Sequence, residues 1–156
     1  MYKKILVPHA GTLEGDLALD HAINIGKSFS SEIILLHVIE EFPHVPVFTL
    51  HATQVSKIKK EFAEITKEMK SVMEKEMTKR VEMCQKNKIK SHLKILTGLP
   101  AEEILKIIKN QKIDLVVMAK RRKLKGIKSI LSLGSVSRKI VENTSCPVLM
   151  VDTEKK

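Results

Sequence analysis

Five short apolar runs, rich in Ile, Leu and Val, recur along the chain with more polar segments between them. They cover residues 3–8, 32–39, 91–98, 114–119 and 147–152. Runs of this length and composition are typical of the strands of a parallel sheet, which are buried on both faces. The pattern therefore predicts a sheet whose two faces are both covered.

The segments between these runs follow a helical period. Helices are predicted over residues 13–29, 56–86, 100–112 and 135–143. In the first of them, apolar and His side chains share one stripe: Leu17, Ala18, His21, Ala22 and Ile25. The second lacks Gly and Pro and predicts a long amphipathic helix whose outer end projects past the sheet. Residues 40–52 contain two prolines and no steady period, which predicts a loop.

Alternation of strand and helix predicts an α/β fold. Right-handed crossovers restrict it to a few topologies, of which we expect the doubly wound, Rossmann-like one: five parallel strands in the order 3-2-1-4-5, with helices on both faces. We expect a single domain over residues 1–152 and a frayed tail at 153–156.

Composition narrows the class of protein further. No apolar run approaches the roughly 18 residues of a membrane helix, and the first residues do not form a signal peptide, so we expect a cytoplasmic protein that does not enter a membrane. Cys84 and Cys146 lack partners at metal-ligand spacing. We expect both to be reduced thiols, Cys146 to be a small buried residue, and no metal site.

The formal net charge of +10 raises the question of nucleic-acid binding. Aromatic residues make up only 3% of the chain, and no zinc-finger, helix-turn-helix or RNA-binding signature is present. Specific nucleic-acid binding is therefore not expected. A surface rich in Lys and Glu, which favours solvation and stability, accounts for the excess charge.

The predicted topology places a ligand site at the carboxyl ends of the strands, where the winding direction reverses between the first and fourth strands. The helix that begins after Gly134 points its N–H groups toward an anion there. Candidate ligand-binding residues at this position are Pro8, His9, Ala10, Val38, Met118, Ala119, Arg121, Arg122, Gly134, Ser135, Val136 and Ser137. His9 either contacts the ligand or fills its loop, whereas His21 and His37 are interpreted as packed core histidines.

Several segments resemble the universal stress protein family over nearly the whole chain, except residues 40–90. The segments are KKILVP, IILLHVI, GLPAEEILKI, DLVVMA and, most specifically, GSVSRKIVENTSCPVLMV. The resemblance implies the doubly wound fold and a homodimer paired through the last strand, Val148, Leu149, Met150 and Val151. In one branch of the family it also implies ATP, with Mg²⁺, at the switch point.

The chain departs from the ATP-binding pattern of that family at several positions. Where the pattern has two glycines after the fourth strand, this chain has Ala119 and Arg122, and the spacing to Gly134 is about two residues longer. Ala10 stands where the family has an Asp that meets the nucleoside. Because a side chain narrows the approach of the backbone to phosphates, the site is predicted to be degenerate for ATP.

A cluster of basic residues follows the fourth strand: Lys120, Arg121, Arg122, Lys123, Lys125 and Lys128. Three interpretations remain open for this segment. It is a solvated flap over a degenerate pocket, or it clamps ATP or another adenine nucleotide together with Gly134, Ser135 and Ser137, or it binds an acidic partner or polyanion. No nucleophile, base and orienting group form a recognisable set, so a binding module is favoured over an enzyme, with a slow ATP hydrolase or a nucleotide-dependent switch as the alternative.

Overall fold

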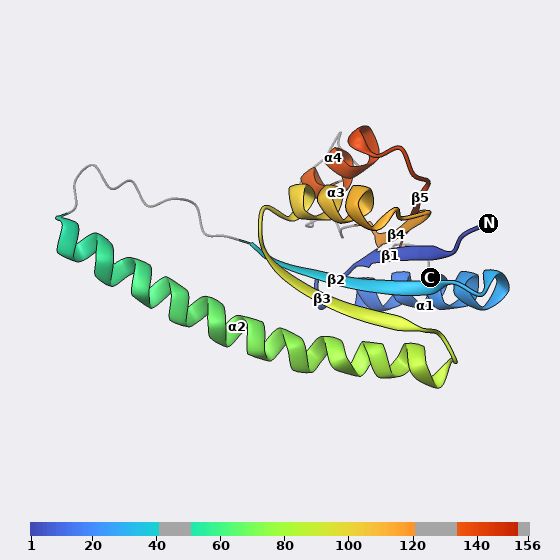
Figure 1. The fold of residues 1–156 in the computed structure, drawn as a ribbon, viewed down its shortest axis with the longest axis horizontal. Coiled ribbons are helices and arrows are strands. Elements are labelled where there is room, and N and C mark those ends of the chain that lie inside the picture. Colours follow the sequence, from blue (N-terminus) through green and yellow to red (C-terminus); the bar gives the residue numbers. More distant parts are fainter. Residues whose placement is uncertain (41–50, 121–133, 153–156) are drawn as a thin grey trace, which may run out of the picture.

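The computed structural model describes residues 1–40, 51–120 and 134–152. Strands and helices alternate along these residues (Figure 1): β1 Lys4–Pro8, α1 Leu13–Phe29, β2 Glu32–Glu40, α2 Ala52–Lys86, β3 Ser91–Gly98, α3 Pro100–Gln111, β4 Leu115–Ala119, α4 Ser135–Asn143 and β5 Val148–Val151. The described strands form one sheet in the order β3-β2-β1-β4-β5, and every pair is parallel. The predicted fold class and strand order are confirmed.

Side chains of the central strands alternate between two packed layers. Ile5 and Val7 of β1 lie in a core with α1 and α2, whereas Leu6 lies in a core with α3 and α4. The two pairs of helices accordingly lie on opposite faces of the sheet (Figure 1). All three of these β1 side chains are fully buried, as expected for a strand covered on both faces.

The buried stripe of α1 differs from the predicted one. Leu17 is 43% exposed, and His21 is also exposed, so the interpretation of His21 as a core residue is wrong. The buried positions are Gly15, Ala18, Leu19, Ala22, Ile23 and Gly26. Ala18 and Ala22 belong to both stripes, but the observed one is rotated by about one residue, so that it includes Leu19 and Ile23 together with Gly15 and Gly26.

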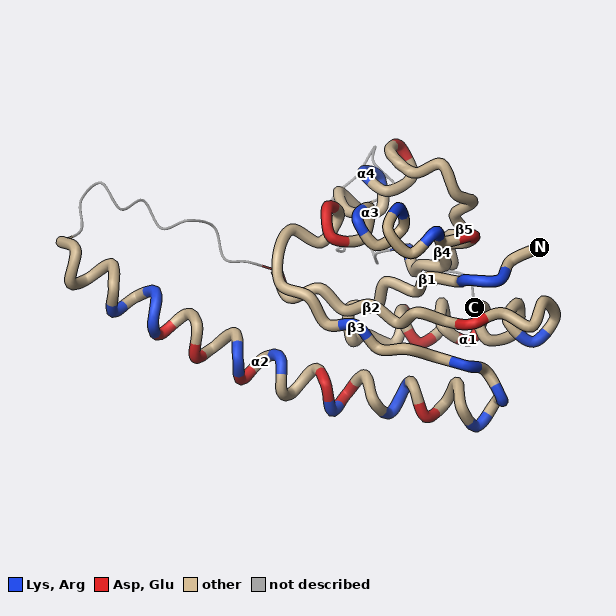
Figure 2. Tube along the Cα trace, viewed as in Figure 1, with Lys and Arg blue, Asp and Glu red and all other residues tan. Residues whose placement is uncertain are grey.

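The long helix begins at Ala52, earlier than the predicted residue 56. Its outer part extends past the sheet, as predicted (Figure 1). Basic and acidic residues follow one another along α2 from Lys57 onward (Figure 2). None of the helices in the described part of the chain combines the length and apolar character that a membrane span requires.

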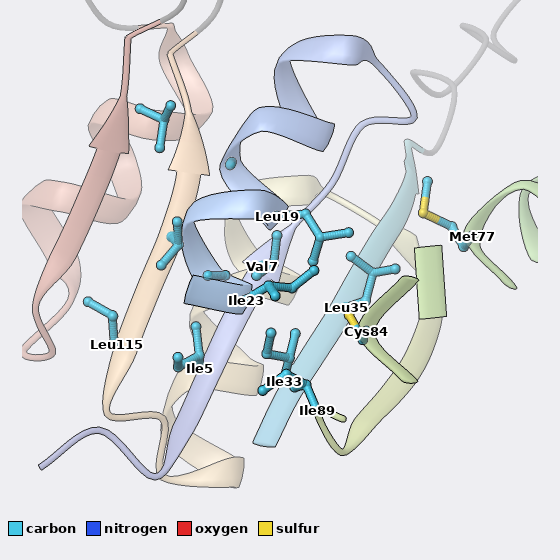
Figure 3. Close-up of a cluster of buried hydrophobic side chains, with 14 residues drawn as sticks. Ile5, Val7, Leu19, Ile23, Ile33, Leu35, Met77, Cys84, Ile89 and Leu115 are labelled. Carbon is cyan, nitrogen blue, oxygen red and sulfur yellow. The ribbon is translucent and has the colours of Figure 1, made fainter. Parts of the chain in front are cut away.

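The core between the sheet and the α1/α2 layer joins residues far apart in sequence. Ile5, Leu19, Ile33 and Cys84 belong to one cluster of buried side chains (Figure 3). Cys84 is fully buried, and this burial raises the pKa of its thiol. Cys146 packs against the opposite core but is only partly buried, so the prediction of a buried Cys146 holds only in part.

Candidate functional site

A cavity of about 600 Å³ opens at the carboxyl edge of the sheet. Its walls come from the ends of β1, β2 and β4 and from the first turns of α1, α3 and α4. The strands β1 and β4 are neighbours in the centre of the sheet, and the chain winds away from them in opposite directions. This is the position at which open α/β sheets bind ligands. We refer to it as the carboxyl-edge cavity.

The structure brings most of the candidate residues together around this cavity. The ones that line it are Pro8, His9, Ala10, Val38, Met118, Ala119, Val136 and Ser137. Gly134 and Ser135 lie immediately before the last two, at the start of α4. Arg121 and Arg122, like most of the basic cluster, lie outside the described residues.

Several polar side chains of the lining were not among the candidate residues, including Glu14, His37 and Glu40. Glu40 is the last residue of β2 and directly follows its apolar run, a position that by itself indicates the carboxyl edge. Glu14 was not recognised as a lining residue, because an acid in the first turn of α1 is already explained by its favourable interaction with the helix dipole. His37 is only half-buried, and its Nδ1 lies 2.8 Å from the His9 carbonyl oxygen, so the core interpretation does not describe it.

His9 joins the loop after β1 to two helices. Its Nδ1 accepts a hydrogen bond of 2.9 Å from the Gly11 N–H, so the ring proton sits on Nε2, 3.0 Å from Asp16 Oδ1. Asp16 also accepts bonds from Arg80 of α2, at 2.5 Å from Nε and 3.1 Å from Nη2. His9 thereby holds the loop after β1 against α1, and it also lines the cavity.

The electrostatic state of His9 follows from its burial. The side chain is fully buried, and burial, together with the charge of Arg80, lowers the pKa of His9 from 6.5 to about 4. The imidazole is therefore neutral at pH 7. Its contact with Asp16 is a hydrogen bond and not an ion pair, while the ion pair of this network is Asp16 with Arg80.

Two glycines allow this arrangement. Gly11 has a φ of +83°, a conformation that side chains disfavour. At Gly15 in α1, a Cβ atom would come within 2.7 Å of the His9 ring. The close approach of α1 to the loop therefore depends on the missing side chain at Gly15.

The start of α4 supplies the donors that an anion requires. Gly134 occupies the N-cap with extended backbone, and Ser137 is buried in the first turn. N–H groups in the first turn of a helix have no partner within the helix and point along its axis, where the dipole favours negative charge. The predicted helix start at Ser135 is confirmed.

The described side chains at the rim do not add net positive charge. Glu14 and Glu40 both line the cavity. The lysine in the lining, Lys120, lies 2.9 Å from a carboxylate oxygen of Asp152. The walls below this rim are mostly apolar and include Leu36, Val38 and Met118. The described cavity thus suits a flat apolar group with few negative charges better than it suits a polyanion.

A second cavity, of about 630 Å³, lies at the amino edge of the sheet. Lys27, Lys86, Lys88 and Lys90 contribute to it, at or after the C-terminal ends of α1 and α2. Cations at helix C-termini stabilise the helix dipole, and Lys90 also pairs with Glu32. These structural roles account for its charge.

Comparison with known proteins decides the family. The model of the universal stress protein family matches residues 1–152. This chain belongs to the universal stress protein family. Universal stress protein MJ0531 of Methanocaldococcus jannaschii is 33% identical over 156 residues, which cover 100% of this chain and 85% of that protein.

Solved structures of the universal stress protein family share the fold. The structure of MJ0577 matches with a TM-score of 0.81 at 26% identity, covering 100% of this chain and 99% of that one. Universal stress protein UspA from Lactobacillus plantarum matches with a TM-score of 0.80 at 20% identity, covering 96% and 97%.

Two further solved universal stress proteins contain a nucleotide. One is in complex with cAMP and has a TM-score of 0.67 at 16% identity, covering 97% of each chain. The other, from Arabidopsis thaliana, has AMP bound and a TM-score of 0.63 at 21% identity, covering 96% of this chain and 91% of that one.

In this chain, no three His, Cys, Asp or Glu side chains of the described residues come together to hold a metal ion.

Proposed function

We propose that this universal stress protein is a binding module that holds an adenine nucleotide in the carboxyl-edge cavity and docks a partner according to whether the cavity is filled. The observation that carries the proposal is the cavity itself, an apolar cleft at the switch point that ends at the first turn of α4. Apolar walls fit a purine, and the α4 N–H groups fit a phosphate.

Two structures with the same fold support the choice of ligand class, since one contains cAMP and the other AMP. The residues present fit such a ligand. Val38, Met118 and Val136 supply apolar surface, and Ser137 supplies a hydroxyl at the start of α4. We place the base between these apolar walls and the phosphate toward Gly134 and Ser135.

ATP is expected to bind more weakly than it does to an intact family site. Ala10 and Ala119 stand where the ATP-binding pattern has Asp and Gly, and Arg122, outside the described residues, replaces the second Gly. Glu14 and Glu40 at the rim repel additional phosphates. We expect a loss of at least about tenfold in affinity, or about 1.4 kcal/mol.

Calorimetric titration with AMP, cAMP and MgATP tests both the adenine-nucleotide site and its weaker binding of ATP. We expect AMP or cAMP to bind more tightly than MgATP. Val136→Trp fills the cavity and should weaken AMP binding by at least about tenfold. Val141→Trp is the matched control, because Val141 lies on the same helix, is 44% exposed and lies outside the lining.

Two outcomes contradict the proposal. Low-micromolar binding of MgATP means that the substitutions do not make the site degenerate. Equal AMP affinity in the wild type and Val136→Trp, or binding of none of the three nucleotides, means that the carboxyl-edge cavity is not a nucleotide site. Circular dichroism of both Trp variants verifies that they are folded.

We further infer that two copies pair through β5. In the described sheet β5 lies at one edge, next to β4. Leu149 is 36% exposed there, and Val148 and Met150 are half-buried. Exposed apolar edge strands are rarely left unpaired, and a two-fold axis pairs identical edges.

A further inference from the structure

The outer part of α2, residues 52–72, has little of the fold to pack against, and we call it the arm. It extends past the end of the sheet (Figure 1). Among the residues of α2, all of which are described, the buried ones are Met77 and Cys84, beyond the arm. The arm exposes large apolar side chains instead: Ile65 is 45% exposed, Met69 40% and Val72 59%.

Apolar residues of the arm recur with a spacing that identifies the kind of surface they match. They are separated by alternating steps of three and four residues, at Val55, Ile58, Phe62, Ile65, Met69 and Val72. This set, the seam, corresponds to the a and d positions of successive heptads. An average period of 3.5 residues is the pattern of helices that pair with other helices in a coiled coil. Helices that pack on a sheet have a wider stripe.

The seam ends where the helix meets the sheet. The next a and d positions are Glu76 and Lys79, which pair with each other at 2.7 Å. Glu76 also lies 3.7 Å from Arg80, the residue that anchors α2 to Asp16. One position after Glu76, Met77 is fully buried against the sheet. The sequence thus changes from a coiled-coil pattern to a sheet-packing pattern at the boundary of the arm.

We propose that the arm is a self-association surface that packs against the arm of another copy of this chain, in a parallel coiled coil. An identical copy presents an identical seam. The residues that flank the seam select the direction. Within the arm, the g positions are Gln54, Glu61 and Glu68, and the e positions are Lys59 and Thr66.

A parallel pair brings each g residue near the e residue five positions later in the other copy. Gln54 then meets Lys59 of the second copy, and Glu61 meets Thr66, without contact between like charges. The antiparallel register that matches the whole seam brings Glu61 near Glu68 of the second copy, twice, and like charges there are unfavourable. The parallel direction is therefore favoured.

The arm is already helical before two copies pair, which lowers the free-energy cost of forming the coiled coil. Met77 and Cys84 hold its other end on the sheet, so the arm continues an existing helix and needs no nucleation of its own. The d positions, Ile58, Ile65 and Val72, are all β-branched, a feature that favours more than two strands. The mass of the assembly is therefore part of the test.

This surface is separate from the β5 edge. The arm belongs to the helix that packs on β2 and β3, while β5 lies at the opposite edge of the described sheet. The two surfaces can therefore be removed independently. Leu149→Lys disrupts the β5 edge and leaves the arm intact.

The experiment measures molar mass by sedimentation equilibrium at micromolar concentration in the Leu149→Lys chain. We expect a mass of at least two chains. Adding Ile65→Lys and Val72→Lys should reduce it to one chain, because charges on the seam cannot be buried. Adding Ala63→Lys and Ser71→Lys is the matched control: it places the same charge on exposed positions of the arm outside the seam and should leave the mass unchanged.

A monomeric Leu149→Lys chain with an intact arm overturns the proposal, as does an assembly that survives both seam substitutions. Direction is tested with Val72→Cys in a Cys146→Ser background under mild oxidation. A parallel pair places the two introduced thiols in one layer and gives a cross-linked dimer. A cross-link that requires Val55→Cys on the other chain shows an antiparallel pair and overturns the parallel assignment.

Discussion

His9 is held in the folded chain as a neutral side chain, and the stability of the protein should therefore depend on pH. The unfolded chain takes up this proton near pH 6.5, whereas the folded chain takes it up near pH 4. Its contribution is fully present above pH 6.5 and is lost as the pH falls toward 4, by as much as about 3 kcal/mol.

His9→Gln keeps a donor and an acceptor but does not titrate. We expect its free energy of unfolding, measured with urea, to fall less between pH 6.5 and 4 than that of the wild type. Parallel pH profiles for the two proteins would contradict a buried, neutral His9.

Two glycines of α1 respond differently to the same substitution. Gly15→Ala places a Cβ 2.7 Å from the His9 ring, which Gly11 and Asp16 hold in place. We expect a loss of about 1 to 3 kcal/mol from overpacking. Gly26→Ala is the control, since its Cβ meets the flexible Cδ1 of Ile89 at 3.3 Å and gains helix propensity. Thermal unfolding that ranks Gly15→Ala as the more stable variant would show that the loop gives way.

At the scale of elements, α4 lines the cavity with its first turn and is the shortest helix of the described residues. It has nine residues, too few for a stable isolated helix, and Ile140 is its fully buried side chain. Ile140→Ala should cost about 2 to 5 kcal/mol and also weaken nucleotide binding, because α4 carries the anion donors. Val141→Ala, on the exposed side, should change both by little. Unfolding and titration of the two variants check this, and equal effects would contradict it.

The elements of the fold were largely predictable from sequence, and the reason is their composition. The central strands β1, β2 and β4 are nearly continuous apolar runs between polar segments, so their positions along the chain are visible without neighbours, and β3 is recognisable from the alternation of strand and helix. The buried stripe of α1 was not predictable in the same way. Leu17 and Leu19 are equally apolar, and which of them is buried depends on how the helix lies on the sheet. The start of α2 at Ala52 was missed because His51, with Gln54, caps it in place of a common cap residue.

The candidate site was predictable where topology determines it. Residues at the ends of β1 and β4 and the start of α4 converge because parallel strands end at one edge. Glu14 and His37 were missed, because their position in the lining depends on how α1 and β2 approach the loop. The role of Asp16 was equally invisible, since its partner Arg80 is 64 residues away in sequence.

At the scale of the whole molecule, assembly through β5 gives a prediction that separates it from the arm. In a chain carrying Ile65→Lys and Val72→Lys, we expect a dimer held by the β5 edge, and addition of Leu149→Lys should convert it to a monomer. Val141→Lys is the control, because it adds the same charge outside that edge. Sedimentation equilibrium measures the mass, and a monomer before Leu149 is changed would contradict the β5 dimer.

The length of α2 also affects the hydrodynamic properties of the protein. A helix of 35 residues is about 52 Å long, while a compact domain of this size has a radius of gyration of about 15 Å. Such a rod raises the frictional coefficient of a single chain well above that of a sphere of equal mass. In size-exclusion chromatography the monomer should therefore elute early, at the volume of a larger globular protein, and elution volume alone would report a dimer where light scattering reports one chain.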